Sequence, residues 1–334
     1  MKAAAGIGVA GAAQLLPGAL HAPPARSDAG ANGGTVPAVL AERAPSGPQM
    51  ACQVTVAGLQ QAGLTAEQVQ LLVLASGFDN GDEWRLAPFH LARACGAVRA
   101  TVLGVQQMSC GGAAGIEHVV ARMTADIALE HAVVVAGDSF AELPAEHWTS
   151  ATGEGVALED GAAAVVLSRV VPGRFHIRSV TSCGAPVVPL PAGLVAADAA
   201  PAVGDTVKQH LVHAWEMRRL ISTVIRQALE DIGAEPDDPS IADVRLPRLG
   251  QPFLRAAVLP ALPPPLRAKV STAGQDTGHL GSGDLLADLA TLHTEASAGP
   301  PGASVSLLLS LGTGMTASCV AVHDTGPLRP SPHS

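Results

Sequence analysis

The chain has 334 residues, which is enough for one large domain or for two fused halves with a substantial core. It carries a formal net charge of −9, has no tyrosine and contains only 2% aromatic residues. Nucleic-acid binding requires basic surface, and single-strand binding also requires aromatic stacking platforms, so this composition excludes nucleic acid as the expected partner.

The apolar composition favours a tightly packed core, and the cysteine pattern favours a reducing environment. Because 48% of the residues are hydrophobic but few are aromatic, the core must consist of Ala, Val and Leu, which suits closely packed layers of helix and sheet. The cysteines are odd in number and widely spaced, so we expect no metal site and a cytoplasmic location. They are Cys52, Cys95, Cys110, Cys183 and Cys319.

The first 25 residues allow two interpretations. Lys2, a run of small apolar residues and a later Ala-Pro-Pro-Ala imitate a secretory signal. The run is rich in Gly and Ala rather than Leu, however, and Gln14 interrupts it, so we favour a first buried strand over Ala4–Val9. No later run approaches the roughly 20 apolar residues of a membrane span, so we expect no membrane association.

Helices and strands alternate along the first half. Short apolar runs predict buried strands, and longer amphipathic stretches predict helices. Thr65 and Gln68 have the spacing of a capping box. The predicted helices are Pro48–Leu64, Pro88–Cys95 and Gly111–Asp126, and the predicted strands after the first are Gln70–Ser76, Val102–Met108, His131–Ala136 and Gly161–Val170.

The second half shows the same alternation. A long Ala/Pro-rich loop is expected over Pro189–Asp205. The predicted helices are Val207–Gly233, Pro252–Leu262 and Asp284–Ala296, and the predicted strands are Phe175–Ser182, Ala242–Leu246, Ser304–Leu311 and Met315–Val322.

The two halves resemble each other. In each, a Gly-rich turn opens a helix, and an apolar strand follows that helix. The pattern predicts an α/β fold with largely parallel sheets, divided into residues 1–170 and 171–334. A duplication would bring the two Gly-rich turns together on a pseudo-two-fold axis, so we expect Cys110 and His279 to be neighbours.

Cys110 lies where a predicted strand ends and a helix begins. The partial positive charge of a helix N-terminus favours a thiolate there, and Gly111 and Gly112 allow a substrate to approach closely. These features favour a nucleophile, although a free cysteine is more commonly a small buried hydrophobic residue.

His279 and Asp284 complete a candidate catalytic set. His279 stands between glycines in the turn expected to face Cys110, and Asp284 follows five residues later, where its carboxylate can orient the imidazole. Asp284 also fits the helix N-cap, and it can fill both roles. The turn in Ser310–Thr316 is a hairpin whose N–H groups can contribute to an oxyanion hole.

Four motifs, at residues 105–119, 133–138, 159–169 and 309–322, together resemble the thiolase-fold condensing enzymes, and most closely β-ketoacyl-ACP synthase III. The resemblance covers nearly the whole chain. It implies a five-layered αβαβα fold, a homodimer and a cysteine that takes an acyl group from a CoA or carrier-protein thioester, with no cofactor.

The chain departs from that family at two positions. Arg248 stands where the family has its catalytic histidine, and residues 274–284 replace the family's second Asn segment with His279 and Asp284. The loss of both neutral donors weakens the case for decarboxylative condensation. The altered set resembles a subgroup of acyltransferases and starter-unit enzymes from polyketide and glycoside pathways.

The resemblance therefore implies a ping-pong acyltransferase of natural-product biosynthesis. His279 would deprotonate Cys110 and later the incoming hydroxyl or carrier thiol, and the N–H groups of Cys110 and Thr313 would hold the oxyanion. A starter-unit ketosynthase and a non-catalytic thiolase-fold partner subunit are the alternatives. An acyl carrier protein is acidic, so it would dock on a basic patch, for which the candidates are Arg245, Arg248 and Arg255.

Overall fold

The structure is a computed structural model that describes residues 1–3, 6–16, 45–77, 86–140, 158–185, 203–271, 277–298, 304–312 and 314–326. The predicted loop Pro189–Asp205 and the start of the predicted first strand fall mostly outside these residues.

One mixed sheet of ten strands runs through the described part of the molecule, in the order β3-β2-β4-β5-β1-β6-β10-β9-β7-β8. Its strands in the first half of the chain are β1 (Gly8–Leu15), β2 (Leu71–Ala75), β3 (Thr101–Val105), β4 (His131–Asp138) and β5 (Gly161–Ser168). Those of the second half are β6 (Phe175–Gly184), β7 (Ile241–Arg245), β8 (Val270–Ser271), β9 (Ser304–Gly312) and β10 (Thr316–Asp324).

The strand order repeats between the two halves. Reading outward from the centre, β1, β5, β4, β2 and β3 on one side correspond to β6, β10, β9, β7 and β8 on the other. The halves join through two residue pairs of β1 and β6, Gly8 with His176 and Val9 with Phe175. This repeat places equivalent turns of the two halves opposite each other.

The expectation of largely parallel strands is wrong for the middle of each half. β2 is parallel to β3 and β4, and β7 is parallel to β8 and β9. The strand β10, in contrast, follows β9 after a short turn and pairs with it antiparallel, and β5 pairs antiparallel with β4. The short connection between β9 and β10 cannot provide the crossover that parallel neighbours require.

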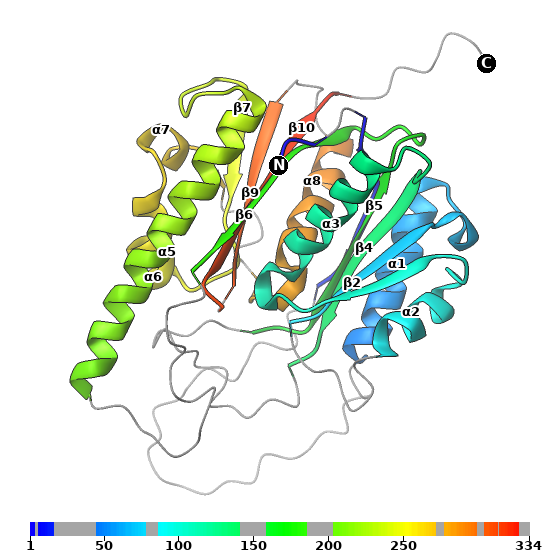
Figure 1. The fold of residues 1–334 in the computed structure, drawn as a ribbon, viewed down its shortest axis with the longest axis horizontal. Helices are drawn as coiled ribbons and strands as arrows, with labels where there is room; N and C mark the ends of the chain where they lie inside the picture. The colour runs from blue at the N-terminus through cyan, green and yellow to red at the C-terminus, as the bar shows by residue number, and fades with distance from the viewer. Residues whose placement is uncertain are drawn as a thin grey trace, which may run out of the picture.

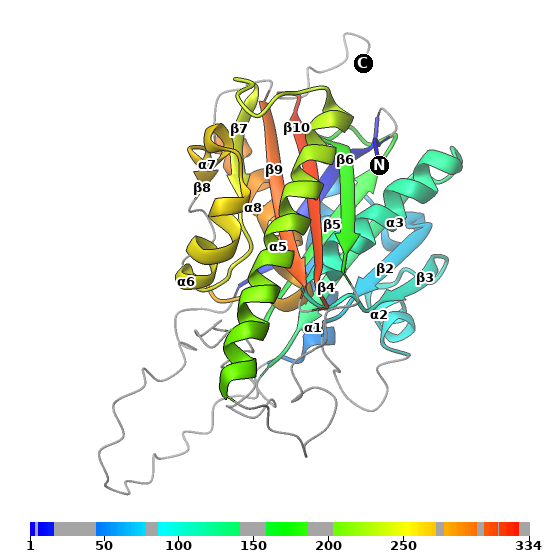
Figure 2. The ribbon, with the colours of Figure 1, turned by 60° about the vertical axis from the view of Figure 1, so that its left-hand side comes forward.

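The helices form three layers around the sheet halves, as Figures 1 and 2 show. α3 (Gly111–Ala125) and α8 (Asp284–Ala298) lie between the halves. α1 (Gly47–Ala62) and α2 (Ala87–Cys95) cover the outer face of the first half, and α5 (Val203–Ile232) covers the outer face of the second. Helix and sheet thus alternate in five layers, held by three hydrophobic clusters: one surrounds α3 and α8 and contacts strands of both halves, one lies under α1 and α2, and one lies under α5.

Most predicted elements are confirmed with shifted ends, but two need correction. The first strand is β1, which extends beyond the predicted end at Val9 and includes Gln14, whose side-chain amide donates to the Thr291 hydroxyl at 3.1 Å. The helix expected over Pro252–Leu262 consists of α6 (Gln251–Phe253), a π-helical turn η6 (Leu254–Val258) and a 3-10 turn η7 (Leu259–Ala261).

The sequence prediction missed α7 (Pro264–Arg267) and the short β8. The capping box at Thr65 is confirmed, on the 3-10 turn η2 (Ala66–Gln68).

Candidate active site

Two short 3-10 turns meet in the central layer. The turn η4 (Met108–Cys110) opens α3, and the turn η8 (Gly281–Gly283) opens α8. A Cβ atom on Gly111 would lie 2.9 Å from the Cβ of Ser282, and one on Gly112 would lie 2.6 Å from the Ser282 carbonyl oxygen. The two Gly-rich turns are therefore in contact, as the duplicated sequence pattern predicts, and the glycines permit it.

The conformation of the turn η4 is set by its own backbone and by a hydrogen bond from β9. Met108 has a φ of 48°, an unusual conformation for a residue with a side chain, and it sets the direction in which the next residues enter α3. The Ser310 hydroxyl on β9 donates to the Ser109 carbonyl oxygen at 2.9 Å. The backbone that carries Ser109 and Cys110 is thus held in one orientation.

The imidazole of His279 lies between a hydroxyl and a carboxylate. Its Nδ1 is 2.5 Å from Asp284 Oδ2, and its Nε2 is 2.6 Å from Ser109 Oγ. All three side chains are buried, with residue exposures of 2% for Asp284, 4% for His279 and 7% for Ser109. The predicted pairing of His279 with Asp284 is present in the structure, and it extends to Ser109.

Asp284 remains a carboxylate although it is buried. Burial acts to raise the pKa of this carboxyl, but the neighbouring His279 and the guanidinium of Arg248 together lower it below its usual value. Its oxygens also accept the backbone N–H groups of Leu280 at 2.8 Å and of Arg248 at 3.0 Å. A fixed anion at Nδ1 keeps a proton on that nitrogen and leaves the lone pair of Nε2 facing Ser109.

Cys110 faces a different set of groups. Its thiol is 3.7 Å from the Thr316 carbonyl oxygen on β10, and burial raises its pKa, while hydrogen bonds with Thr316, Ser310 and Ser318 offset part of that rise. A Cβ atom on Gly312 would lie 3.3 Å from the sulfur. Burial therefore acts against the thiolate that the sequence predicts at Cys110.

The predicted oxyanion hole is not assembled from Cys110 here. The Cys110 N–H donates to the Gln107 carbonyl oxygen at 3.1 Å, which closes the 3-10 turn. The second predicted donor, Thr313, lies outside the described residues.

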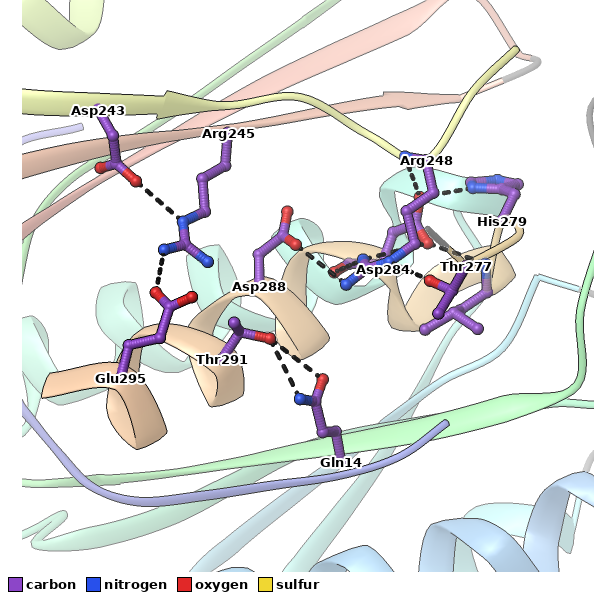
Figure 3. A network of polar contacts seen from close by, with 11 residues as sticks. Gln14, Asp243, Arg245, Arg248, Thr277, His279, Asp284, Asp288, Thr291 and Glu295 are labelled. Atoms are coloured by element: carbon purple, nitrogen blue, oxygen red, sulfur yellow. Dashed lines mark hydrogen bonds and ion pairs between the residues drawn. The ribbon is translucent and has the colours of Figure 1, made fainter. Parts of the chain in front are cut away.

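The predicted basic patch is wrong for two of its three arginines. Arg245 is only 4% exposed and forms ion pairs with Asp243 at 3.0 Å and Glu295 at 2.5 Å. Arg248 is 3% exposed, and its side chain lies inside the molecule along α8 (Figure 3). Only Arg255 is exposed. A partner cannot contact the two buried guanidinium groups.

Arg248 instead supports the candidate catalytic pair. Its Nη1 donates to the Asp284 carbonyl oxygen at 2.9 Å, its Nε donates to the Thr277 hydroxyl at 3.0 Å, and its Nη2 is 3.1 Å from Asp288 Oδ1 (Figure 3). Burial raises the pKa of Asp288 to about 7 against the opposing attraction of Arg248. The guanidinium neutralises the negative charge that two buried carboxyl groups would otherwise concentrate beside His279.

Sequence reasoning missed Ser109 and Asp138 in this region. Asp138, at the end of β4, accepts the N–H and hydroxyl of Ser282 at 2.9 and 2.7 Å and the N–H of Gly77 at 3.0 Å, so it holds η8 in place. The motif at residues 133–138 includes Asp138, but nothing local indicates its partners. Ser109 adjoins Cys110 in the sequence, and only the position of His279 distinguishes the two.

Two kinds of site are not found in the described part of the chain. No group of three or more His, Cys, Asp or Glu side chains there has the arrangement of a metal site. None of the helices described is both long and apolar enough to cross a bilayer.

No family model matches the chain, and no curated protein matches its sequence. Its structure is similar to that of the acyltransferase ChlB3, with 23% identity, coverage of 85% of both chains and a TM-score of 0.70. It is also similar to the tetronic acid condensing enzyme AbyA1, with 18% identity, coverage of 83% of this chain and 85% of that one and a TM-score of 0.64.

A third similar structure is 3-oxoacyl-[acyl-carrier-protein] synthase III from Aquifex aeolicus, with 17% identity, coverage of 84% of this chain and 85% of that one and a TM-score of 0.63. These neighbours are thiolase-fold enzymes of the synthase III type. The prediction of a five-layered thiolase fold is therefore confirmed.

Proposed function

We propose that the protein is an acyltransferase of natural-product biosynthesis that works in two steps. In the first, a group on the turn η4 takes an acyl group from a CoA or acyl-carrier-protein thioester. In the second, the acyl group passes to a hydroxyl of a sugar or polyketide, or to another carrier. The similarity to ChlB3, AbyA1 and synthase III supports the broader assignment to acyl-transferring enzymes of this fold.

The buried His279–Asp284 pair carries the proposal. General-base catalysis requires an imidazole with a free lone pair next to the attacking group and an anion that orients it, and the distances of 2.6 and 2.5 Å provide both. The sequence predicts Cys110 as the attacking group, whereas the group that lies 2.6 Å from this imidazole is its neighbour Ser109. In either case the imidazole accepts the proton of the attacking group on the turn η4, donates that proton to the departing thiolate, and repeats the cycle with the acceptor.

The same residues make carbon–carbon bond formation the less supported reaction. Decarboxylative condensation requires neutral donors around a thioester carbonyl, where the enolate develops. At one of the two expected positions, Arg248 already donates to the Asp284 carbonyl oxygen and the Thr277 hydroxyl. At the other, His279 is oriented by a carboxylate, an arrangement suited to removing a proton rather than to donating one.

Intact-mass measurement with a panel of acyl-CoA and acyl-carrier-protein thioesters tests the proposal. We expect a mass increment equal to the acyl group, which disappears on a chase with a hydroxyl acceptor. A β-ketoacyl product with release of CO₂ from malonyl-carrier protein would instead establish the condensing alternative. The absence of any increment and any product across the panel would favour the non-catalytic partner subunit.

The remaining expectations follow from the same proposal. We expect a homodimer that needs no cofactor, and a location in the reducing cytoplasm, which agrees with five free cysteines. Light scattering of the purified protein tests the dimer, and full activity after dialysis against a chelator tests the independence from metal.

A further inference from the structure

Ser109 is the side chain in direct contact with the base. Its hydroxyl oxygen is 2.6 Å from His279 Nε2, and that imidazole is held through Nδ1 by Asp284 at 2.5 Å. Asp284 is itself fixed by two backbone N–H donors, those of Leu280 and Arg248. A hydroxyl, an imidazole and a buried carboxylate in this order have the geometry by which nucleophilic triads are recognised, independent of fold.

Cys110 lacks this arrangement. Its thiol is directed at the Thr316 carbonyl oxygen on β10, and the hydroxyls of Ser310 and Ser318 lie near it. Within the described residues, the thiol contacts a carbonyl oxygen and hydroxyl groups rather than a base, and the residue is only 1% exposed. Its surroundings are those of a small buried side chain that fills the space beside Gly312.

We propose that Ser109, rather than Cys110, receives the acyl group, so that Ser109, His279 and Asp284 form the catalytic set. This inference rests on the proposed function and revises one assignment within it. Ser109 Oγ attacks the thioester carbonyl carbon and transfers its proton to His279 Nε2. The carbon–sulfur bond then breaks, His279 returns the proton to the departing sulfur, and an acyl-O-serine ester and a free thiol result.

The oxygen ester formed on Ser109 also restricts the chemical class of the acceptor. The hydrolysis of a thioester releases more free energy than that of an oxygen ester. Acyl transfer from the donor thioester to Ser109 is therefore thermodynamically favourable, whereas transfer from Ser109 back to a carrier thiol is unfavourable. Transfer to a hydroxyl exchanges one oxygen ester for another and regenerates the serine hydroxyl. The acceptor class that fits Ser109 is therefore an alcohol, such as a sugar or polyketide hydroxyl.

Chemical identification of the acyl-enzyme bond tests this inference. The wild type and the variants Ser109→Ala, Cys110→Ala and Cys95→Ala are incubated with acetyl-, propionyl- and butyryl-CoA and with the corresponding acyl-carrier proteins, and then quenched in acid. The adduct is located by peptide mass spectrometry and treated with neutral hydroxylamine, which cleaves thioesters rapidly and oxygen esters slowly. Cys95→Ala is the matched control, because Cys95 is buried on α2, outside the two turns.

The expected result is a hydroxylamine-resistant adduct on the peptide that contains Ser109, localised to the serine by fragmentation. Its rate of formation should fall by about 10³-fold or more in Ser109→Ala and change by less than about threefold in Cys110→Ala and Cys95→Ala. Circular dichroism confirms that each variant is folded, and Ser109→Thr replaces Ser109→Ala as a test of hydroxyl function if the alanine variant unfolds.

Two outcomes overturn the inference. A hydroxylamine-labile adduct on Cys110 in the wild type, lost in Cys110→Ala, would disprove the serine assignment but leave the proposed acyl transfer intact. No adduct on any residue and no turnover with any donor would overturn the inference together with the proposed function.

Discussion

The helices α3 and α8 occupy equivalent places in the two halves of the molecule, yet they bring different chemistry to the site. Each has 15 residues, lies in the central layer and follows a 3-10 turn. α3 has no acidic residue in its first turn, whereas α8 begins with Asp284 and carries Asp288 one turn later, both buried. The duplicated scaffold thus has the nucleophile candidates in one half and the proposed base with its carboxylate in the other.

The two helices also differ in how their buried faces contribute to folding stability. The buried face of α3 consists of residues such as Ile116, Val119 and Met123, which favour folding through apolar burial alone. The corresponding face of α8 includes Asp284 and Asp288 beside the fully buried guanidinium of Arg248. Buried ion pairs contribute little net stability, because desolvation offsets the attraction between the charges. The polar arrangement on α8 is therefore better explained by the site than by stability.

The largest expected effect tests the division of roles between the halves. His279→Gln should lower the rate of acyl-enzyme formation by about 10²–10⁴-fold, since it removes the base. Asp284→Asn should lower the rate by a similar factor, and the double variant should be little worse than either single variant, because the two residues act as a unit. Quenched-flow mass spectrometry measures all three rates. Multiplicative effects in the double variant would show that the residues act independently.

The next effect tests the contact between the two turns. Gly112→Ala places a Cβ atom 2.6 Å from the Ser282 carbonyl oxygen and 2.9 Å from Leu286 Cγ, so it should push α3 and α8 apart and lower the free energy of unfolding by about 1–3 kcal/mol. Gly58→Ala in α1 is the matched control. Its new Cβ meets only Val166, at an ordinary 3.4 Å, and alanine favours the helix. Denaturant titration of both variants makes the comparison, and equal stability of the two would contradict the tight contact.

A pH effect tests the buried charges along α8. The pKa of Asp288 is raised from 3.8 to about 7, so the folded protein binds a proton that the unfolded chain has released between about pH 4 and 7. The contribution of Asp288 to stability therefore falls by up to a few kcal/mol as the pH rises through that window. Thermal melts should show Asp288→Asn gaining stability relative to the wild type from pH 5 to pH 8.

Asp238→Asn provides the control for that pH effect, because Asp238 lies outside the charges along α8. Hydrogen bonds from Ser240 lower the pKa of Asp238, so its stabilising contribution is present above about pH 4 and is lost only as the pH falls below that value. The stability difference between Asp238→Asn and the wild type should therefore stay constant from pH 5 to pH 8. A parallel slope in both variants would show that the raised pKa of Asp288 is not the cause.

The smallest effect concerns carrier-protein docking. Of the three arginines predicted to form a basic patch, only Arg255 is exposed, and a single rim charge changes binding only modestly. Arg255→Glu should change kcat/KM by less than about threefold with an acyl-carrier protein and leave that with acyl-CoA unchanged. A large loss specific to the carrier protein would identify Arg255 as part of a docking surface built with other residues.

Much of the fold could be predicted because its signals are local. Continuous apolar runs indicated the strands β2, β4, β5, β9 and β10, and the Thr65–Gln68 spacing indicated a capped turn. The mixed strand directions and the π-helical turn at Leu254–Val258 could not be read in this way. They depend on which strands pair and on how a helix fits its neighbours, and both are long-range properties.

The candidate nucleophile turn and the histidine–carboxylate turn could both be predicted from the sequence, because each is a short run of residues with its own glycines. That Ser109 faces His279 while Cys110 faces Thr316, and that Arg245 and Arg248 are interior, depends instead on long-range packing. The physical reason is that neighbouring side chains in a tight turn point in different directions. Which of them meets the base depends on how β9, β10 and η8 pack around the turn, and those segments lie far away in the sequence.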